Sequence, residues 1–202
     1  MFLIFSVLAL KSDAVMVSVL IGTKAELIQF QKDIYSGALS ADTDAKLTAD
    51  IDLGGTPWTP VHVPDASGDI SKMAYSGTFD GDGHVISGLN LADVEIKENT
   101  GINSYSGLFL SLGTEGVIKN LTLSGNVSNG KTVFSVQVGV FTAFSSGKIE
   151  NCVNLCNVDV PSMGGTHKRA GGIAGSARGA IINCVNMGNI TAANNGYEIA
   201  AG

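Results

Sequence analysis

Five consecutive residues, Asp80-Gly81-Asp82-Gly83-His84, combine the side chains of this chain that are best suited to chemistry. Two carboxylates and an imidazole so close together could carry out acid–base chemistry or bind calcium. A calcium loop of the EF-hand type needs a glutamate at its twelfth position, however, and the twelfth residue counted from Asp80 is Leu91. The alternative is a tight turn, with glycine at positive φ and aspartate bonded to its own backbone. The sequence favours the turn.

Asp50 and Asp52 are the second candidate pair. They alternate along a predicted strand at residues 47–53, so both should project from one face of it. Paired carboxylates cleave glycosidic bonds in many enzymes, although alternating Asp on a solvated strand is the commoner arrangement. The chain lacks the Gly-x-Ser-x-Gly elbow of serine hydrolases and the His-Glu-x-x-His motif of zinc peptidases. We therefore predict no enzyme activity and no catalytic, metal-binding or cofactor-binding residue.

The three cysteines, Cys152, Cys156 and Cys184, predict neither a disulfide framework nor a zinc site. They form no Cys-x-x-Cys pair, and no histidine lies at ligand spacing. Cys152 and Cys184 stand one repeat apart in the pattern described below, so their sulfur atoms could come close. Buried free thiols are the favoured interpretation, and a bond or a shared metal is the alternative.

Composition narrows the classes of protein that this chain could belong to. Its 202 residues include 26 glycines and only 15% charged residues, and the net charge is −6. This length suffices for one sizeable domain, and the composition is typical of short strands joined by tight turns. The negative charge argues against nucleic acid as a partner, because clustered Lys and Arg are needed to neutralise phosphates. The basic cluster His167-Lys168-Arg169 is predicted to be solvated charge in a loop.

The first twenty residues allow two interpretations. Residues 2–10 are apolar and have the length of a signal-peptide core, yet no Lys or Arg precedes them. Residues 1–20 are therefore either a signal peptide or the first strand of the fold. The apolar run is too short to cross a membrane, and no membrane span is predicted elsewhere. Residues 21–202 are predicted to form a single domain.

Four columns of similar residues define an internal repeat. They are Ile86, Ile118, Ile149, Ile181; Leu89, Leu121, Cys152, Cys184; Gly107, Gly139, Gly172; and Val127, Val158, Ile190. Each apolar run has only a few residues and is bounded by Gly or Asn, which favours short strands over helices. With three short strands per repeat, the pattern predicts an all-β fold, a right-handed parallel β-helix with turns of roughly 32 residues.

A further column contains Asn120, Asn151 and Asn183, beside a predicted bend. Asparagines stacked at the spacing of neighbouring strands can hydrogen-bond along the axis. At the C-terminal end, residues 198–202 match residues 168–172, so another turn begins there. We expect the domain to be truncated at this end, with further repeats or domains following.

One helix is predicted, over residues 24–35. Thr23 and Glu26 form a capping box in which the threonine hydroxyl accepts from the Glu26 amide. Apolar residues then recur at helical spacing, and Gly37 supplies the stop. Because the terminal turn of a solenoid exposes strand edges, this helix is expected to cover the first turn.

Residues 171–190 contain three linked motifs, Gly-Gly-aliphatic-x-Gly, Gly-x-Ile-x-Asn-Cys and Asn-x-Gly-x-aliphatic. Upstream lie residues 47–53, Trp58-Thr59-Pro60 and residues 77–89. This combination resembles the GLUG motif of bacterial surface proteins and the region that often precedes it. The resemblance implies a β-helix module of a large secreted or wall-attached adhesin-like protein, and such repeats also occur ahead of immunoglobulin-A-cleaving metallopeptidase domains. No functional residue is carried over, because the motif positions are structural.

These observations predict a noncatalytic extracellular module. It would act as a stalk, or as a recognition surface for a host or neighbouring-cell protein or glycan. Binding should reside in long loops between strands, at residues 62–74, 92–106, 128–136 and 159–170. The competing hypothesis is a carbohydrate-active enzyme, a polysaccharide lyase or glycosidase, because β-helices also support such activity. That enzyme would need Asp50, Asp52 and Asp80 to converge on a groove.

Overall fold

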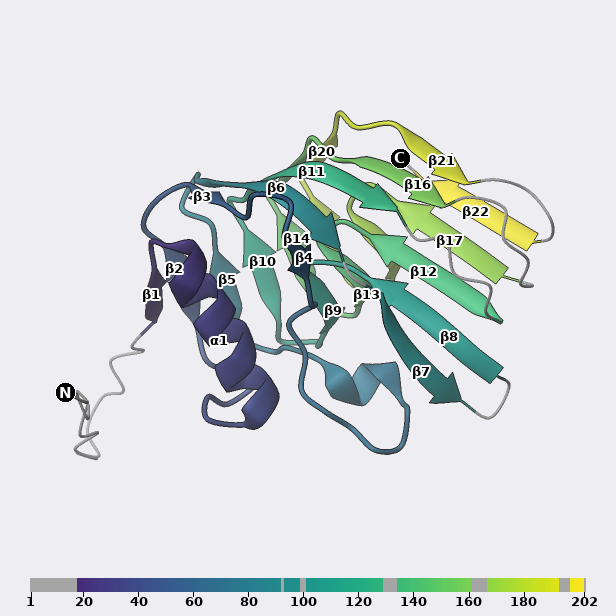
Figure 1. Ribbon diagram of the computed structural model, residues 1–202, viewed down its shortest axis with the longest axis horizontal. Coiled ribbons are helices and arrows are strands. Elements are labelled where there is room, and N and C mark those ends of the chain that lie inside the picture. The colour runs from purple at the N-terminus through teal and green to yellow at the C-terminus, as the bar shows by residue number, and fades with distance from the viewer. Residues whose placement is uncertain are drawn as a thin grey trace.

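The computed structural model describes residues 18–91, 93–98, 101–128, 134–160, 167–192 and 197–201. These residues wind into a parallel β-helix of about four turns with one helix at the N-terminal end (Figure 1). The predicted fold class is therefore confirmed. Of residues 1–20, the structure describes residues 18–20, and strand β1 (Val19–Ile21) begins there. The signal-peptide hypothesis concerns residues that lie outside the described ones.

The first sheet has six parallel strands in the order β1-β2-β5-β10-β14-β19. After β1 these are β2 (Ala45–Leu47), β5 (Thr78–Asp80), β10 (Val117–Lys119), β14 (Lys148–Glu150) and β19 (Ile181–Ile182). One column runs through the sheet in register and contains Ala45, Phe79, Ile118, Ile149 and Ile181. Its first four members are buried, so this column fills the inside of the coil.

The second sheet lies on the next side of the coil. It contains β3 (Ile51–Asp52), β4 (Pro57–Trp58), β6 (Val85–Leu91), β11 (Thr122–Ser128), β15 (Val153–Asn154), β16 (Asn157–Val160), β20 (Val185–Asn186) and β21 (Ile190–Ala192). The two halves of β11 pair with β15 and β16 separately. Val127, Val158 and Ile190 align as predicted.

Two more sheets complete each turn. The third contains β7 (Val94–Glu98), β8 (Gly101–Ser106), β12 (Ser135–Gly139), β17 (His167–Gly171) and β22 (Tyr197–Ala201). The fourth contains β9 (Phe109–Leu112), β13 (Thr142–Ser145) and β18 (Ala174–Ala177). The pair β7 and β8 is antiparallel, and every other strand pair among the described residues is parallel.

A full turn therefore has four strand-bearing sides, and the prediction of three strands per repeat is wrong. The missing strands are β8, β12 and β17, which overlap the segments predicted as loops at residues 92–106, 128–136 and 159–170. These strands contain polar side chains, which made the segments resemble loops in the sequence. β22 aligns in register with β17, with Glu198 opposite Lys168, which confirms the predicted match between the two segments over the described residues.

The predicted columns fail in the first turn. Phe79, and not Ile86, pairs with Ile118, whereas Ile86 pairs with Leu123. Leu89 likewise aligns with Gly125 rather than with Leu121. The step from residue 79 to residue 118 is 39 residues, against 31 and 32 for the next two steps, because the hairpin strand β7 is inserted into this turn.

Two smaller corrections concern the alignment of one glycine column and the extent of one predicted strand. Gly139 aligns with Gly171, not with the predicted Gly172. The predicted strand at residues 47–53 is two strands, β2 and β3, separated by a bend. Leu47, Ile51 and Leu53 are all buried, so the apolar alternation continues around a corner of the coil instead of along one straight strand.

Helix α1 (Lys24–Ser36) covers the first turn, as expected (Figure 1). The Thr23 hydroxyl accepts from the Glu26 amide at 3.2 Å, and Gly37 ends the helix with φ of 75°. Its buried face carries Leu27, Phe30 and Ile34, and the Phe30 ring lies 6.0 Å from the rings of both Tyr75 and Phe79. The helix thus closes the core at this end with aromatic packing.

The segment after β4 folds against the outside of the coil. It includes the 3₁₀ helix η1 (Ile70–Met73), whose Met73 packs in a second, smaller core with Ile96, Tyr105, Leu110 and Ala143. Residues 62–74 are therefore anchored to the outer surfaces of the third and fourth sheets instead of forming a free loop. This anchoring creates the hollow described below.

Candidate functional site

Residues 80–84 form a tight turn at the end of β5. The His84 amide donates to the Gly81 carbonyl at 2.8 Å, and the two central residues, Asp82 and Gly83, have φ of 50° and 85°. Positive φ at both central positions is the pattern of a type I′ turn, which glycine and aspartate tolerate best. Asp80 accepts from the Asp82 amide at 2.9 Å. The backbone therefore takes the turn geometry that the sequence favours.

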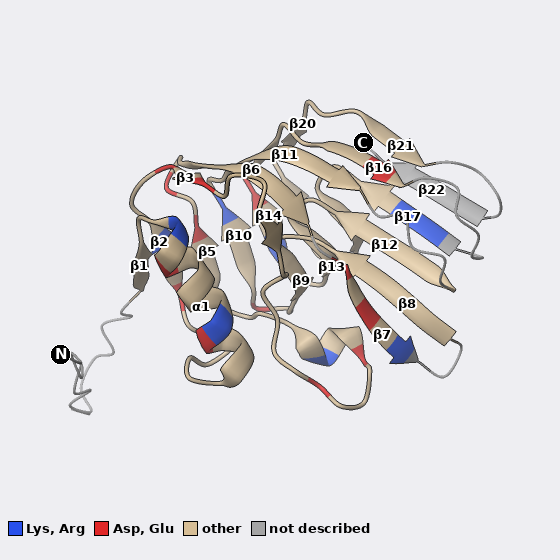
Figure 2. Cartoon of the chain, viewed as in Figure 1, with Lys and Arg blue, Asp and Glu red and all other residues tan. Residues whose placement is uncertain are grey.

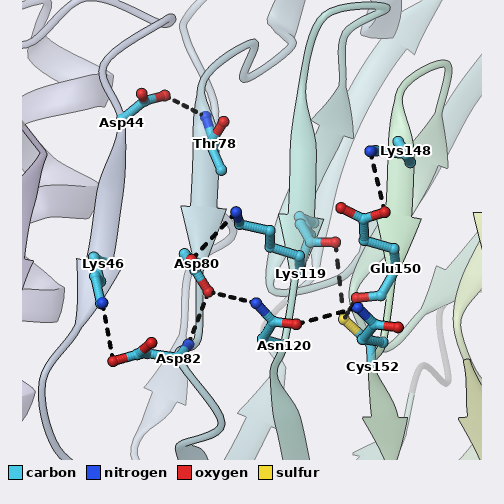
Figure 3. Close-up of polar contacts among 12 residues, drawn as sticks. Asp44, Lys46, Thr78, Asp80, Asp82, Lys119, Asn120, Lys148, Glu150 and Cys152 are labelled. Carbon is cyan, nitrogen blue, oxygen red and sulfur yellow. Dashed lines mark hydrogen bonds and ion pairs between the residues drawn. The ribbon is translucent and has the colours of Figure 1, made fainter. Parts of the chain in front are cut away.

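Both carboxylates of this turn are engaged by lysines from neighbouring turns of the coil (Figure 3). Lys46 lies 3.0 Å from Asp82, and Lys119 lies 3.3 Å from Asp80. Partial burial raises the pKa of the Asp80 carboxyl, but the Asp82 amide, Asn120 and Lys119 outweigh it, so the net pKa is lower than usual. Asp80 is thus an ionised structural anion that joins β5 to β10.

The structure brings His84 and Asp50 together, with Nδ1 of the imidazole 3.1 Å from Oδ1 of the carboxylate. The same oxygen accepts from the Val85 amide at 3.0 Å, and these two contacts hold the pKa of Asp50 below its usual value. Asp52 is engaged separately, accepting from the Gly54 amide at 2.8 Å. Asp50 and Asp52 therefore bond to different partners and do not face a common one. The contact between His84 and Asp50 does join two of the residues singled out in the sequence.

Replacing Asp80 by asparagine is expected to destabilise the fold by about 1 kcal/mol at neutral pH, since the ion pair with Lys119 is lost and the turn bond is kept. Because the pKa of Asp80 is lowered on folding, its contribution is present above its ordinary pKa of 3.8 and disappears as pH falls below that value. Urea unfolding at neutral pH and at about pH 2.5 measures this. The difference from the wild type should shrink in acid. Asp159→Asn, an exposed β16 carboxylate, is the control, and a pH-independent difference would contradict the assignment.

The asparagine column starts at Asp80. The Asn120 amide donates to Asp80 at 3.0 Å (Figure 3). Asn151 donates to Asn120 at 3.3 Å, and Asn183 donates to Asn151 at 3.4 Å. All three asparagines have φ between 51° and 53°, a left-handed conformation that asparagine adopts more readily than most residues. The predicted ladder is confirmed, and it assigns Asp80 a role in holding the coils together.

The cysteines line the interior of the coil. Cys152 and Cys156 are buried, Cys184 is half-buried, and all three are free. Burial raises the pKa of Cys152 and of Cys156 to about 12. These thiols are therefore protonated at neutral pH and are poor nucleophiles. Among the described residues, no group of three or more His, Cys, Asp or Glu side chains is arranged to hold a metal ion.

A polar hollow of about 570 Å³ lies on the outer surface, where the third and fourth sheets meet residues 67–70. Tyr105, Gln137 and Arg169 lie side by side in register on β8, β12 and β17, and all three line the hollow. Phe144 and Ser176 line it from the fourth sheet, and Arg178 lines it from the position directly after β18. We call this hollow the arginine groove. Its volume is in the range of small-ligand sites.

Both arginines of the chain lie in this groove. The Arg178 guanidinium lies 5.2 Å from the centre of the Phe144 ring, which is a cation–π contact. Gln137 is only 8% exposed, and its Oε1 atom has no hydrogen-bond partner among the residues that the structure describes. A buried polar atom of this kind normally finds a partner, so the groove retains unused binding capacity.

Sequence reasoning missed the arginine groove. It placed Lys168 and Arg169 in a solvated loop, but both lie in β17 and Lys168 is only 3% exposed, so that interpretation is wrong. A signal was available, because Tyr105, Gln137 and Arg169 each stand two residues before Gly107, Gly139 and Gly171, the glycines of one column. The alignment of Tyr105, Gln137 and Arg169 is therefore predictable from the repeat. The contribution of residues 67–70 to the groove is not, because they lie outside the repeat.

Comparison with known proteins yields one partial match. No protein-family model matches the chain, and no solved structure matches it. Halomucin of Haloquadratum walsbyi is 32% identical over 120 residues, which cover 58% of this chain. The match spans 1% of the length of halomucin. None of these comparisons bears on the GLUG resemblance, which stays a prediction.

No helix in the described part of the chain has the length and apolarity needed to cross a bilayer.

Proposed function

We propose that this chain is a noncatalytic β-helix module of a secreted or cell-surface protein, related to GLUG-repeat proteins and acting as a binding surface or stalk. The observation that carries the proposal is that the candidate catalytic carboxylates make structural contacts within the coil. Asp80 is tied to Lys119 and Asn120, and Asp82 is tied to Lys46, all in contacts between turns of the coil. Such contacts stabilise a solenoid, whereas a hydrolase or lyase needs carboxylates that face its substrate.

Three further features support the module hypothesis. After the first turn the coil repeats at steps of 31 and 32 residues, and such regularity suits an extended scaffold. The halomucin match takes up 1% of a much longer protein, as expected of a segment used within long chains. The apolar residues 2–10 are compatible with export. Extracellular placement is part of the proposal, and protease treatment of intact cells that produce the protein tests it.

One observation favours the rival hypothesis of a carbohydrate-active enzyme. His84 and Asp50 lie 3.1 Å apart on the surface, with the Asp50 side chain 71% exposed. A His–carboxylate pair can act as a general base. The neighbouring Asp80 and Asp82, however, are paired with lysines, so no free second carboxylate is supplied from that turn.

Incubating the full chain with polygalacturonate, alginate, hyaluronate and dextran tests the two hypotheses. We expect no new reducing ends and no absorbance from unsaturated sugars, because the candidate groups are engaged in the fold. Turnover that disappears in Asp50→Asn or Asp80→Asn, while Asp159→Asn keeps it, would replace the module hypothesis by the enzyme hypothesis. Circular dichroism of each variant verifies that it is folded.

A further inference from the structure

The arginine groove has chemistry that the coil does not use. The chain contains ten lysines but only two arginines, and both arginines line this one hollow. β8 and β12 carry neither acidic nor basic residues, while β17 contributes basic ones (Figure 2). The groove therefore combines uncharged polar side chains from β8 and β12 with two arginines and one carboxylate, Asp69. This is a binding surface for an anion that also carries hydrogen-bonding groups.

The charge in the groove is available. Among the described residues, neither Arg169 nor Arg178 forms an ion pair with a carboxylate. Asp69 also lines the groove and keeps its negative charge, because the Ser71 hydroxyl and amide donate to its Oδ1 at 2.7 and 3.0 Å and lower its pKa; among the described residues it forms no ion pair with either arginine. Guanidinium groups bind carboxylates through two parallel hydrogen bonds, a geometry that lysine cannot reproduce. The two arginines thus point to a carboxylate ligand.

Gln137 adds a second, independent requirement. Its side chain is more than nine-tenths buried and faces the groove, and its amide oxygen has no partner in the described part of the chain. A sugar hydroxyl can donate to that oxygen, and it could equally accept if the amide were turned over. Gln137 is in register with Arg169 on the next strand, so the two side chains stand about 4.8 Å apart along the row.

We propose that the arginine groove binds an acidic oligosaccharide, with a sugar carboxylate on Arg169 and Arg178 and a sugar hydroxyl on Gln137. A uronic acid carries both groups on one ring, which matches two requirements placed on adjacent strands. Ser176 of β18 adds a further hydroxyl to the groove. The inference rests on the proposed noncatalytic function, because it names the ligand class of that same module.

Isothermal titration of the full chain with trigalacturonic acid tests the proposal. We expect saturable binding that weakens at least about tenfold in Arg169→Gln and in Arg178→Gln, since each removes a charge-assisted contact to the sugar carboxylate. Gln137→Met should weaken binding by about threefold or more, through loss of one hydrogen bond. Lys148→Gln, which removes a positive charge from β14 on the first sheet, is the matched control and should bind as the wild type does. Thermal melts verify that every variant is folded.

Three comparison ligands define the specificity. Maltotriose, a neutral trisaccharide, and hexaglutamate, an acidic peptide, should bind at least about tenfold more weakly. Equal binding of maltotriose would remove the requirement for charge, and equal binding of hexaglutamate would assign the groove to acidic peptides; either overturns the proposal. Sodium sulfate at the same charge concentration should not compete, and full competition would reduce the site to a simple anion site.

Failure of this inference can be told apart from failure of the module hypothesis. The titrated samples are assayed afterwards for cleavage of trigalacturonic acid. If the ligand neither binds nor is cleaved, the groove assignment is wrong while the noncatalytic module stands. If it is cleaved, the noncatalytic function is wrong, whichever residues bind the sugar.

Discussion

Replacing Phe79 by alanine is expected to lower the free energy of unfolding by about 3–5 kcal/mol. Phe79 is fully buried in the central column of the first sheet. Its ring lies 6.0 Å from the ring of Phe30 in α1 and 5.2 Å from the ring of Phe109 in β9. It therefore joins the capping helix to the first turns of the coil. Removing it leaves a cavity between rigid elements that cannot collapse. The loss of stability should therefore include the full contribution of that cavity.

Urea unfolding followed by circular dichroism measures this effect. Leu20→Ala is the control, because Leu20 lies in the neighbouring strand β1 with 62% exposure and should change stability by less than about 0.5 kcal/mol. A loss below about 1 kcal/mol for Phe79→Ala would show that α1 does not seal the core through this ring. Such a result would place the helix elsewhere at the end of the coil.

Asn154→Ala should destabilise the protein by about 2–4 kcal/mol, more than is usual for a polar residue. Asn154 is fully buried, and its Oδ1 accepts from the Cys156 amide at 2.8 Å. Its Nδ2 donates to the Cys156 carbonyl at 3.1 Å and to Asn186 in the next turn at 2.7 Å. Alanine would leave the amide and carbonyl of a buried residue without partners, and that desolvation is costly.

The matched control for this prediction is Asn126→Ala. Asn126 is exposed on β11 and should change stability by less than about 0.5 kcal/mol. Asn154→Asp is a sharper probe, because it preserves the shape and the acceptor but removes the donor and adds a buried charge. Aspartate should therefore be at least as damaging as alanine at neutral pH. If both variants unfold at the wild-type urea concentration, the side chain is dispensable.

Repetition made much of the fold predictable. Asn120, Asn151 and Asn183 were identified from their spacing alone, and the ladder of hydrogen bonds confirms them. Val127, Val158 and Ile190 align as predicted for the same reason. A repeated turn must place equivalent residues in contact with one another, so spacing reports contact directly. The Asn154 and Asn186 pair follows the same spacing, although it was not predicted.

The incorrect predictions concern two kinds of segment. One is the turn in which an insertion interrupts the repeat, and the other is strands whose polar outer residues resemble those of loops. Ile86 was placed in the column of Ile118 because the distance of 32 residues matched the repeat, yet the insertion of β7 shifts that turn. The predicted loop at residues 159–170 contains most of β17, whose outer face carries Arg169, and the predicted loop at residues 128–136 overlaps the first two residues of β12. Outward-facing residues of a coil have no obligation to be apolar, so composition did not distinguish them from loops.

In the candidate site, the local turn is predictable from the sequence, whereas the contacts between turns of the coil are not. The turn at residues 80–84 was predicted from local chemistry, because Gly and Asp at positive φ are recognisable in a short segment. The contacts of Asp80 with Lys119 and of Asp50 with His84 join residues 34 to 39 positions apart and depend on the register between turns. Local sequence does not encode that register when an insertion intervenes.

The sequence by itself determined the parallel coil, its interior columns and its helical cap, because these follow from periodicity and from capping residues close together in the chain. Only the tertiary structure decided the register of the first turn and the existence of the arginine groove. That groove needs residues 67–70, Gln137, Arg169 and Arg178 to meet across more than a hundred positions. The physical reason is that main-chain pairing between turns, rather than any local preference, sets which side chains become neighbours.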